Sequence, residues 1–152
     1  MFKHLLVPID GSPTSELAVA KAIGLAKAFD TEVTAIYVID PYPFTGVGAD
    51  FAYGQGQYLN AAKAAATDAL SNARTQMEQA GVKVKTATVE SHTVWRGILE
   101  AAESGGADLI VMGSHGRSGI EKLVLGSVAQ KVITNTRLPV LHIAATLQYA
   151  DA

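Results

Sequence analysis

Cysteine is missing from this sequence of 152 residues, and its absence excludes disulfides, thiolate metal sites and thiol-based catalysis. Long apolar runs are missing too, since none approaches the ~18 residues of a membrane-spanning helix. An excess of basic residues is also lacking, because 12 lysines and arginines stand against 14 aspartates and glutamates. The sequence therefore has no extended positive field of the kind that attracts nucleic acid. We expect neither a membrane nor a nucleic-acid partner.

A secretion signal is not evident either. The start MFKHLLVPID has too short an apolar stretch and no small-residue cleavage site, which favours a cytoplasmic location. The composition, with 49% hydrophobic and 17% charged residues, is typical of a globular protein. The length is the usual one for a single domain, so we expect residues 1–152 to form one domain.

Apolar, β-branched segments alternate along the chain with segments of helical periodicity. Strands are predicted at 3–9, 32–40, 82–90, 107–113 and 138–145, and helices at 13–29, 59–80, 93–105 and 127–136. Residues 41–57, rich in proline, glycine and aromatics, are expected to form an irregular loop and a possible lid. The alternation predicts a doubly wound, three-layer α/β/α fold, with four helices on a five-stranded parallel sheet of order 3-2-1-4-5.

In such a sheet the ligand crevice lies at the carboxyl ends of the strands, where the strand order reverses. Here the reversal falls between the first and fourth strands. The loops that leave these strands begin DGSP, from Asp10, and GSHG, from Gly113. These two loops are the predicted site.

The second loop opens the stretch GSHGRSGIEKLVLGS, residues 113–127. It matches neither the P-loop pattern GxxxxGK[ST] nor the dinucleotide pattern GxGxxG. Its own spacing is Gly-x2-Gly-x9-Gly-Ser, formed by Gly113, Gly116, Gly126 and Ser127.

This spacing fits two anion-binding turns. The first two glycines would let the backbone turn tightly and approach a ligand without a Cβ. Gly126 and Ser127 would do the same at a helix start, where free N–H groups and the helix dipole favour an anion. Residues 117–125 look like a short amphipathic segment that anchors the loop. The alternative is an ordinary loop between strand and helix that ends in a serine cap.

The stretch MGSHGRSGIEKLVLGSVAQKV resembles the nucleotide-binding signature of the universal stress protein family, in its ATP-binding branch. VPIDGS near the start and PVL near the end are similar to the same family, so the resemblance covers nearly the whole chain. It implies a site for ATP, or for ADP or AMP, together with Mg²⁺. The residues that it implies as nucleotide contacts are Pro8, Ile9, Asp10, Val38, Met112, Gly113, His115, Gly116, Arg117, Gly126, Ser127 and Val128.

The resemblance also implies a role for each position. The Asp10 carboxylate would accept from the ribose hydroxyls, and Val38 would contact adenine through its backbone. Met112 and Gly113 would border base and sugar. The amides around His115–Arg117 and Gly126–Val128 would hold the phosphates.

Several of these residues also have simpler explanations. Asp10 could merely form the turn or cap the following helix, and Arg117 could be a solvated loop charge. Val38 and Met112 could be core residues, which is compatible with a nucleotide contact. The histidines are scattered without the spacing of metal ligands, so no metal site built from protein side chains is expected.

The expected function is that of a homodimeric, nucleotide-binding regulatory protein with slow or absent hydrolysis. Phosphoryl transfer needs a held metal and a positioned nucleophile, and no motif supplies them. A weak ATPase or self-phosphorylating phosphotransferase stays open as the alternative. A Ser-His-Asp hydrolase is disfavoured because the GxSxG elbow is missing, and a flavin carrier is suggested by fold class alone.

The resemblance further implies a dimer in which the last strand, Val140 to Ala145, pairs across a twofold axis. An additional, unidentified protein partner is also possible.

Overall fold

The computed structural model describes residues 2–41, 49–114 and 126–144. Its centre is a five-stranded parallel sheet in the order β3-β2-β1-β4-β5, as the sequence predicts. The strands are β1 (His4–Pro8), β2 (Glu32–Ile39), β3 (Val84–Glu90), β4 (Leu109–Gly113) and β5 (Val140–Ile143). The helices are α1 (Pro13–Phe29), α2 (Ala49–Gln79), α3 (Val94–Gly105) and α4 (Ser127–Asn135).

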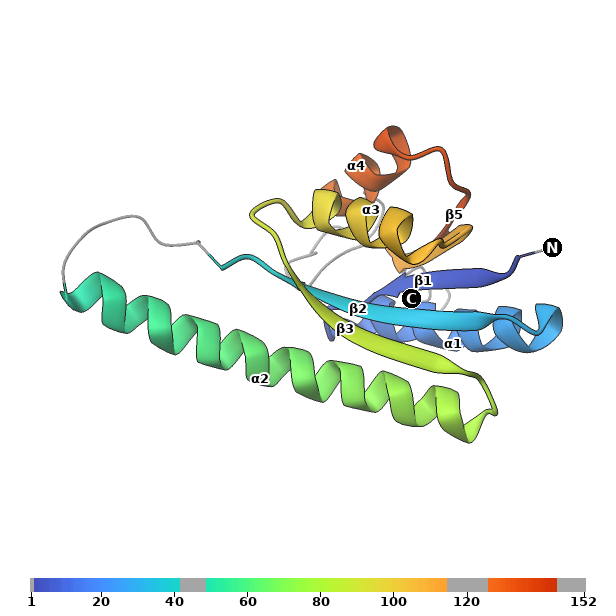
Figure 1. Ribbon diagram of the computed structural model, residues 1–152, viewed down its shortest axis with the longest axis horizontal. Coiled ribbons are helices and arrows are strands. Elements are labelled where there is room, and N and C mark those ends of the chain that lie inside the picture. Colours follow the sequence, from blue (N-terminus) through green and yellow to red (C-terminus); the bar gives the residue numbers. More distant parts are fainter. Residues whose placement is uncertain (1, 42–48, 115–125, 145–152) are drawn as a thin grey trace, which may run out of the picture.

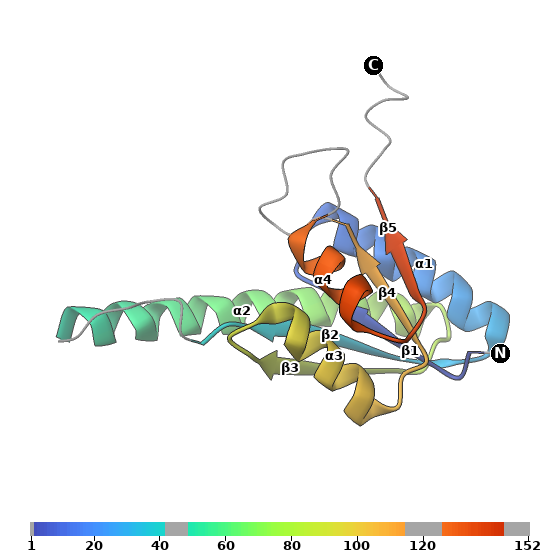
Figure 2. The same ribbon diagram turned by 90° about the horizontal axis from the view of Figure 1, so that it is seen from above.

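The helices cover both faces of the sheet in three layers. Helices α1 and α2 lie on one face, and α3 and α4 lie on the other (Figures 1 and 2). Successive side chains of β2 alternate between the two cores: Ala35 and Tyr37 pack toward α1 and α2, whereas Ile36 and Val38 pack toward α3 and α4. The central strand β1 serves both cores, which explains its uninterrupted run of buried Leu5, Leu6 and Val7.

Helix α1 begins and ends as its sequence predicts. The Ser12 side chain caps it by accepting from the Ser15 amide at 3.2 Å, and Pro13 occupies the first turn. At the other end Asp30 adopts a left-handed conformation with φ of 54°. The helix buries Ala18, Val19, Ala22 and Ala26 in the core that α1 and α2 form with the sheet. Because most of these side chains are small, α1 packs closely on the sheet.

Helix α2 differs from the expectation. It begins at Ala49, not at Leu59, so residues 49–57 are helical and the predicted irregular loop at 41–57 is wrong in that part. Gly54 and Gly56 lower helix propensity without stopping a helix, and the last proline before the helix is Pro43. The first turns of α2 project beyond the sheet (Figure 1). Residues 42–48, the rest of the proposed lid, lie outside the described residues.

The edge strand β3 alternates as predicted only at its start. Val84 and Thr86 are half-buried and Lys85 is exposed, but the pattern then shifts, with Thr88 exposed and Val89 packed on the α3 side. The other elements follow their predictions to within a few residues at the ends. No helix in the described part of the chain is long and apolar enough to cross a membrane.

Candidate functional site

The predicted crevice lies where β1 and β4 are neighbours. Leu5 pairs with Leu109 and Leu6 with Ile110, so both strands end at the same edge of the sheet. The segment after β1 then enters α1, which leads back to β2, while the segment after β4 leads to α4 and β5. The two predicted loops therefore start side by side, in the position that parallel sheets use for ligands.

Asp10 begins a tight, polar turn after β1. Its Oδ1 accepts from the Ser12 amide at 2.9 Å, and its own N–H donates to Ser15 Oγ at 3.1 Å. Gly11 between them has a φ of 81°, which is costly for residues with a side chain. The turn-forming role considered for Asp10 is therefore real. Its second oxygen, Oδ2, makes no hydrogen bond within the described residues and stays available for a ligand.

Gly113 is required for a reason that the sequence does not reveal. It keeps a strand conformation as the last residue of β4, so no positive φ demands glycine there. A Cβ at this position would lie 2.6 Å from Thr14 Oγ1 and 2.7 Å from the Thr14 carbonyl carbon. The first turn of α1 thus packs directly on the end of β4. Gly113 permits this approach, whatever it also does for a ligand.

The two predicted turns meet at Ser114. This residue is buried, with 4% of its surface exposed, and its amide donates to the Ile143 carbonyl at 2.7 Å. Its carbonyl accepts from the Gly126 amide at 3.0 Å. Gly126, far along the chain, is thereby held at the end of β4. His115, Gly116 and Arg117, together with the segment 117–125, lie outside the described residues.

Helix α4 starts at this junction with open amides. Gly126 is its N-cap residue, and no side chain caps the first turn. Ser127 is exposed and Val128 is half-buried. Since unpaired N–H groups and the helix dipole favour an anion, the start of α4 is the described part of the site best suited to a phosphate.

Two of the remaining predicted contacts, Met112 and Val38, lie on the α3 and α4 side of the sheet. Met112 is 5% exposed within this core, and Val38 packs against it, so the core-packing role considered for both is present. Pro8 is half-buried at the end of β1, and Ile9 is buried on the α1 and α2 side. The Ile9 side chain therefore lies in the core under α1 and α2, on the other face of the sheet from Met112 and Val38.

Gly97 is a further position that the sequence reasoning missed. A Cβ there would lie 3.0 Å from Ser91 Cβ and 3.2 Å from Val38 Cγ1. The glycine lets α3 approach the end of β2, beside the proposed adenine position. A glycine within an amphipathic helix is the signal that would have indicated such a close approach.

A protein-built metal centre finds no support in the described residues. They contain no group of three histidine, aspartate or glutamate side chains placed to hold a metal ion. The expected Mg²⁺ therefore has no such cluster in the described part of the chain. If it accompanies a nucleotide, the phosphates have to supply most of its ligands.

A sequence model of the universal stress protein family matches residues 1–143. The chain belongs to the universal stress protein family. The observed sheet order β3-β2-β1-β4-β5 is the one that the alternation of strands and helices predicts, and solved structures of the family share this fold.

Individual members of the universal stress protein family resemble the chain over most of its length. Universal stress protein MJ0531 of Methanocaldococcus jannaschii is 42% identical over 142 residues, which cover 93% of this chain and 81% of the relative. The solved structure of MJ0577 from the same organism is 29% identical with a TM-score of 0.81, covering 96% of this chain and 98% of that one. A universal stress protein solved in complex with cAMP is 24% identical with a TM-score of 0.68, covering 95% and 99%, and shares the fold.

Proposed function

We propose that the chain binds an adenine nucleotide, ATP foremost, at the carboxyl ends of β1 and β4. The observation that carries this proposal is the Gly126–Ser114 hydrogen bond, which holds the uncapped start of α4 against the end of β4. Asp10 follows the neighbouring strand. An anion site and a carboxylate thus occupy one crevice, as a nucleotide with phosphates and ribose hydroxyls requires.

The proposed contacts follow from this arrangement. Asp10 Oδ2, which has no partner among the described residues, accepts from the ribose. The amides of Ser127 and Val128 bind phosphate, together with those around residues 115–117, while the Gly126 amide stays bonded to the Ser114 carbonyl and holds the turn in place. The backbone of Val38 and the surroundings of Met112 border the base. The member of the family solved with cAMP supports adenine as the base.

The proposed role is regulatory binding with slow or absent hydrolysis. Within the described residues Asp10 directly follows β1, and no group of side chains is placed to hold a metal ion, so neither a held metal nor a positioned general base is evident beside the proposed phosphates. The chain then acts through the difference between its nucleotide-bound and nucleotide-free states. In the same proposal, β5 is the edge strand through which two cytoplasmic copies pair, over Val140 to Ala145, of which Ala145 lies outside the described residues.

Purified protein tests the nucleotide first. We expect heat denaturation to release an adenine nucleotide, and calorimetry on the stripped protein to give a micromolar or tighter Kd for ATP. ATP incubated with the protein and Mg²⁺ for hours stays largely intact. If no nucleotide is released and ATP does not bind with a submillimolar Kd, the proposal is wrong. Rapid formation of ADP would instead show that the protein is an ATP-hydrolysing enzyme.

A variant pair then locates the site. Ser127→Ala removes a hydroxyl at the start of α4 and should weaken ATP binding roughly tenfold, because a hydrogen bond to a charged group contributes about 1.5–3 kcal/mol. Ser127 is exposed, so the fold is expected to survive. Ser71→Ala, an exposed serine of α2, is the matched control and should bind like the parent. Equal affinities for the two variants would place the phosphates elsewhere.

A further inference from the structure

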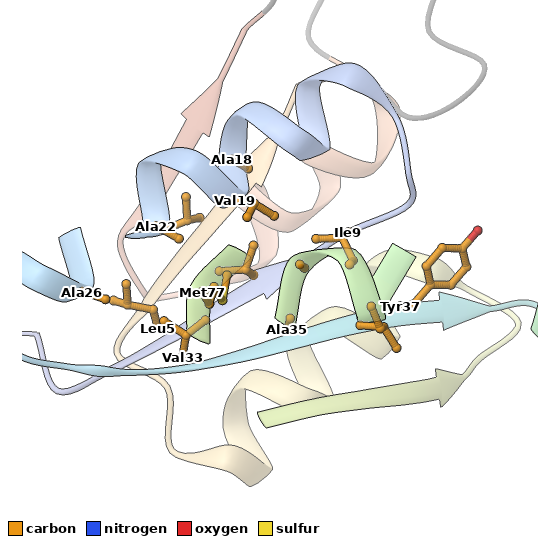
Figure 3. Close-up of a cluster of buried hydrophobic side chains, with 14 of the residues drawn as sticks. Leu5, Ile9, Ala18, Val19, Ala22, Ala26, Val33, Ala35, Tyr37 and Met77 are labelled. Atoms are coloured by element: carbon orange, nitrogen blue, oxygen red, sulfur yellow. The ribbon is translucent and has the colours of Figure 1, made fainter. Parts of the chain in front are cut away.

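A second concave site lies on the opposite face of the sheet from Val38 and Met112. It is a cavity of about 330 Å³ between α1, α2 and the ends of β1 and β2. Its volume is at the lower end of the ~300–1,000 Å³ found for small-molecule sites. The base is apolar and buried and is formed by Ile9, Val19 and Tyr37. Figure 3 shows Val19 on α1 with Ile9 close to it, and Tyr37 farther along β2.

Helix α2 forms the other wall with a row of small residues. Ala65, Ala69 and Ala73 recur one turn apart and all line the cavity. Small side chains leave the space between α1 and α2 unfilled. The rim beyond them is polar, with the exposed amide side chains of Asn72 and Gln76.

Among the described residues, every charged side chain that lines the cavity is acidic. These residues are Asp10, Glu16 and Asp68. Among the described residues, neither Glu16 nor Asp68 is in an ion pair. A concave surface with one sign of charge concentrates ions of the opposite sign. The carboxylates do not form a metal-binding group, so they suit an extended organic cation better than a single metal ion.

Ser15 provides an independent indication of an occupant. It lines the cavity with only 5% of its surface exposed. Its Oγ accepts from the Asp10 amide, but the described residues offer no acceptor for its own hydroxyl hydrogen. A hydroxyl donor that faces a cavity without a protein acceptor bonds to water or to a ligand, so an occupant with an oxygen at this point would pair with it.

We propose that this cavity is a second binding site, for a small organic cation that carries an ammonium group and a hydroxyl on a short apolar chain. The ammonium lies at the rim between Glu16 and Asp68. The chain covers Ile9, Val19 and the alanines of α2, and the hydroxyl oxygen accepts from Ser15. This site shares Asp10 with the proposed ribose contact but is separate from the proposed phosphate contacts at α4.

Three probes with the same four-carbon body test the chemistry in the full chain stripped of nucleotide. They are 4-aminobutan-1-ol, the neutral butane-1,4-diol and the anionic 4-hydroxybutanoate. In ¹H–¹⁵N NMR titrations we expect saturable shifts of the Gly11, Ala69 and Ala73 amides with the amino alcohol, and at least fivefold weaker responses with the other two. Equal responses to the amino alcohol and the diol, or no saturable shift at these amides, overturn the proposal.

Variants of the rim test the position. Asp68→Asn and Glu16→Gln should each raise the Kd of the amino alcohol roughly two- to fivefold, as expected for partly exposed charge pairs. Glu78→Gln is the matched control, since Glu78 is exposed on α2, pairs with Arg74 and does not line the cavity. A control that weakens binding as much as Asp68→Asn contradicts the proposal. ATP affinity of the Asp68 and Glu78 variants is measured separately, so the two sites are tested independently.

Discussion

At the scale of single residues, glycine serves two different purposes in this chain. Gly11 and Gly81, with φ of 81° and 82°, allow turns that residues with a side chain adopt at a cost. Gly113 and Gly97 keep ordinary conformations and instead leave room for Thr14 and for Val38. The second purpose depends on which element lies opposite. It is therefore visible only once the chain is folded.

Gly113 provides a direct test of this distinction. Gly113→Ala places a Cβ within 3 Å of Thr14 and should lower the free energy of unfolding by about 1–3 kcal/mol, through overpacking. Gly24→Ala, within α1 and with open space around its Cβ, should instead raise it by about 0.5–1 kcal/mol. Urea denaturation measures both. Equal effects would mean that α1 does not pack on the end of β4 as described.

The same contact limits Gly113 as a probe of ligand binding. A larger residue such as valine would block a phosphate, but it would also press against Thr14 and disturb the fold. Lost affinity in such a variant could then come from either effect. Ser127 is the better probe because it is exposed.

At the scale of elements, the start of α2 is where local sequence and structure disagree most. Gly54 and Gly56 suggest a loop, whereas the structure places both within a helix. A long helix tolerates single glycines, because each costs only about 1 kcal/mol and the neighbouring residues supply the remaining hydrogen bonds. Gln55 Nε2 also donates to the Pro41 carbonyl at 2.9 Å, which ties this turn to the end of β2.

The helical assignment predicts the effect of removing these glycines. Gly54→Ala and Gly56→Ala have open space around the added Cβ and should each raise the free energy of unfolding by about 0.5–1 kcal/mol, as measured by urea denaturation. In an irregular loop the same changes bring no gain from helix propensity. A lack of stabilisation in both variants would favour the loop expected from the sequence.

The junction of β4 and α4 is the second informative element. Gly126 has φ of −60° and ψ of 150°, a conformation that proline also adopts. Gly126→Pro therefore removes the N–H that donates to the Ser114 carbonyl without requiring a different backbone. We expect ATP affinity to fall about tenfold relative to Gly126→Ala, which also adds a Cβ but keeps the N–H. Equal calorimetric Kd values of the two variants for ATP would show that the Gly126–Ser114 hydrogen bond does not contribute to ATP binding.

At the scale of the whole molecule, the order of the strands determines both the crevice and the free edge. Because β1 lies between β2 and β4, the connections diverge at the carboxyl ends of β1 and β4, which is where parallel sheets of this kind place a ligand crevice. Because β5 is last in the order, its outer edge has no strand beside it in the described chain. The Ser114 amide donates to the Ile143 carbonyl of β5, and the Ser114 carbonyl accepts from the Gly126 amide at the start of α4. The backbone of Ser114 therefore connects the proposed dimer strand to the proposed phosphate site.

Pairing through β5 can be tested at an exposed apolar side chain. Leu141 is 38% exposed on this strand, and Leu141→Asp should raise the dimer Kd at least about tenfold, through lost apolar burial and added charge. Ile133, 40% exposed on α4, provides the control Ile133→Asp, which should leave the dimer intact. Sedimentation equilibrium measures both. If only Ile133→Asp dissociates the dimer, the interface lies at α4 and not at β5.

The sequence by itself determined the alternation of strands and helices, the sheet order and the position of the glycine-rich loop. These follow from local periodicity, turn chemistry and the handedness of parallel connections, which need no knowledge of distant contacts. It also indicated the family. The sequence also singled out the loop that begins at Asp10 and the Gly126–Ser127 turn, because their turn chemistry lies in adjacent residues, while their nucleotide contacts are implied by the resemblance and stay predictions.

Only the tertiary structure decided which residues face one another. The approach of Thr14 to Gly113, of Val38 to Gly97 and of Gly126 to Ser114 joins segments that are far apart in the chain. The cavity between α1 and α2 arises in the same way, because its size depends on how closely two helices pack over alanines. Packing distances of this kind result from the whole set of side chains between the elements, and local sequence patterns do not contain them.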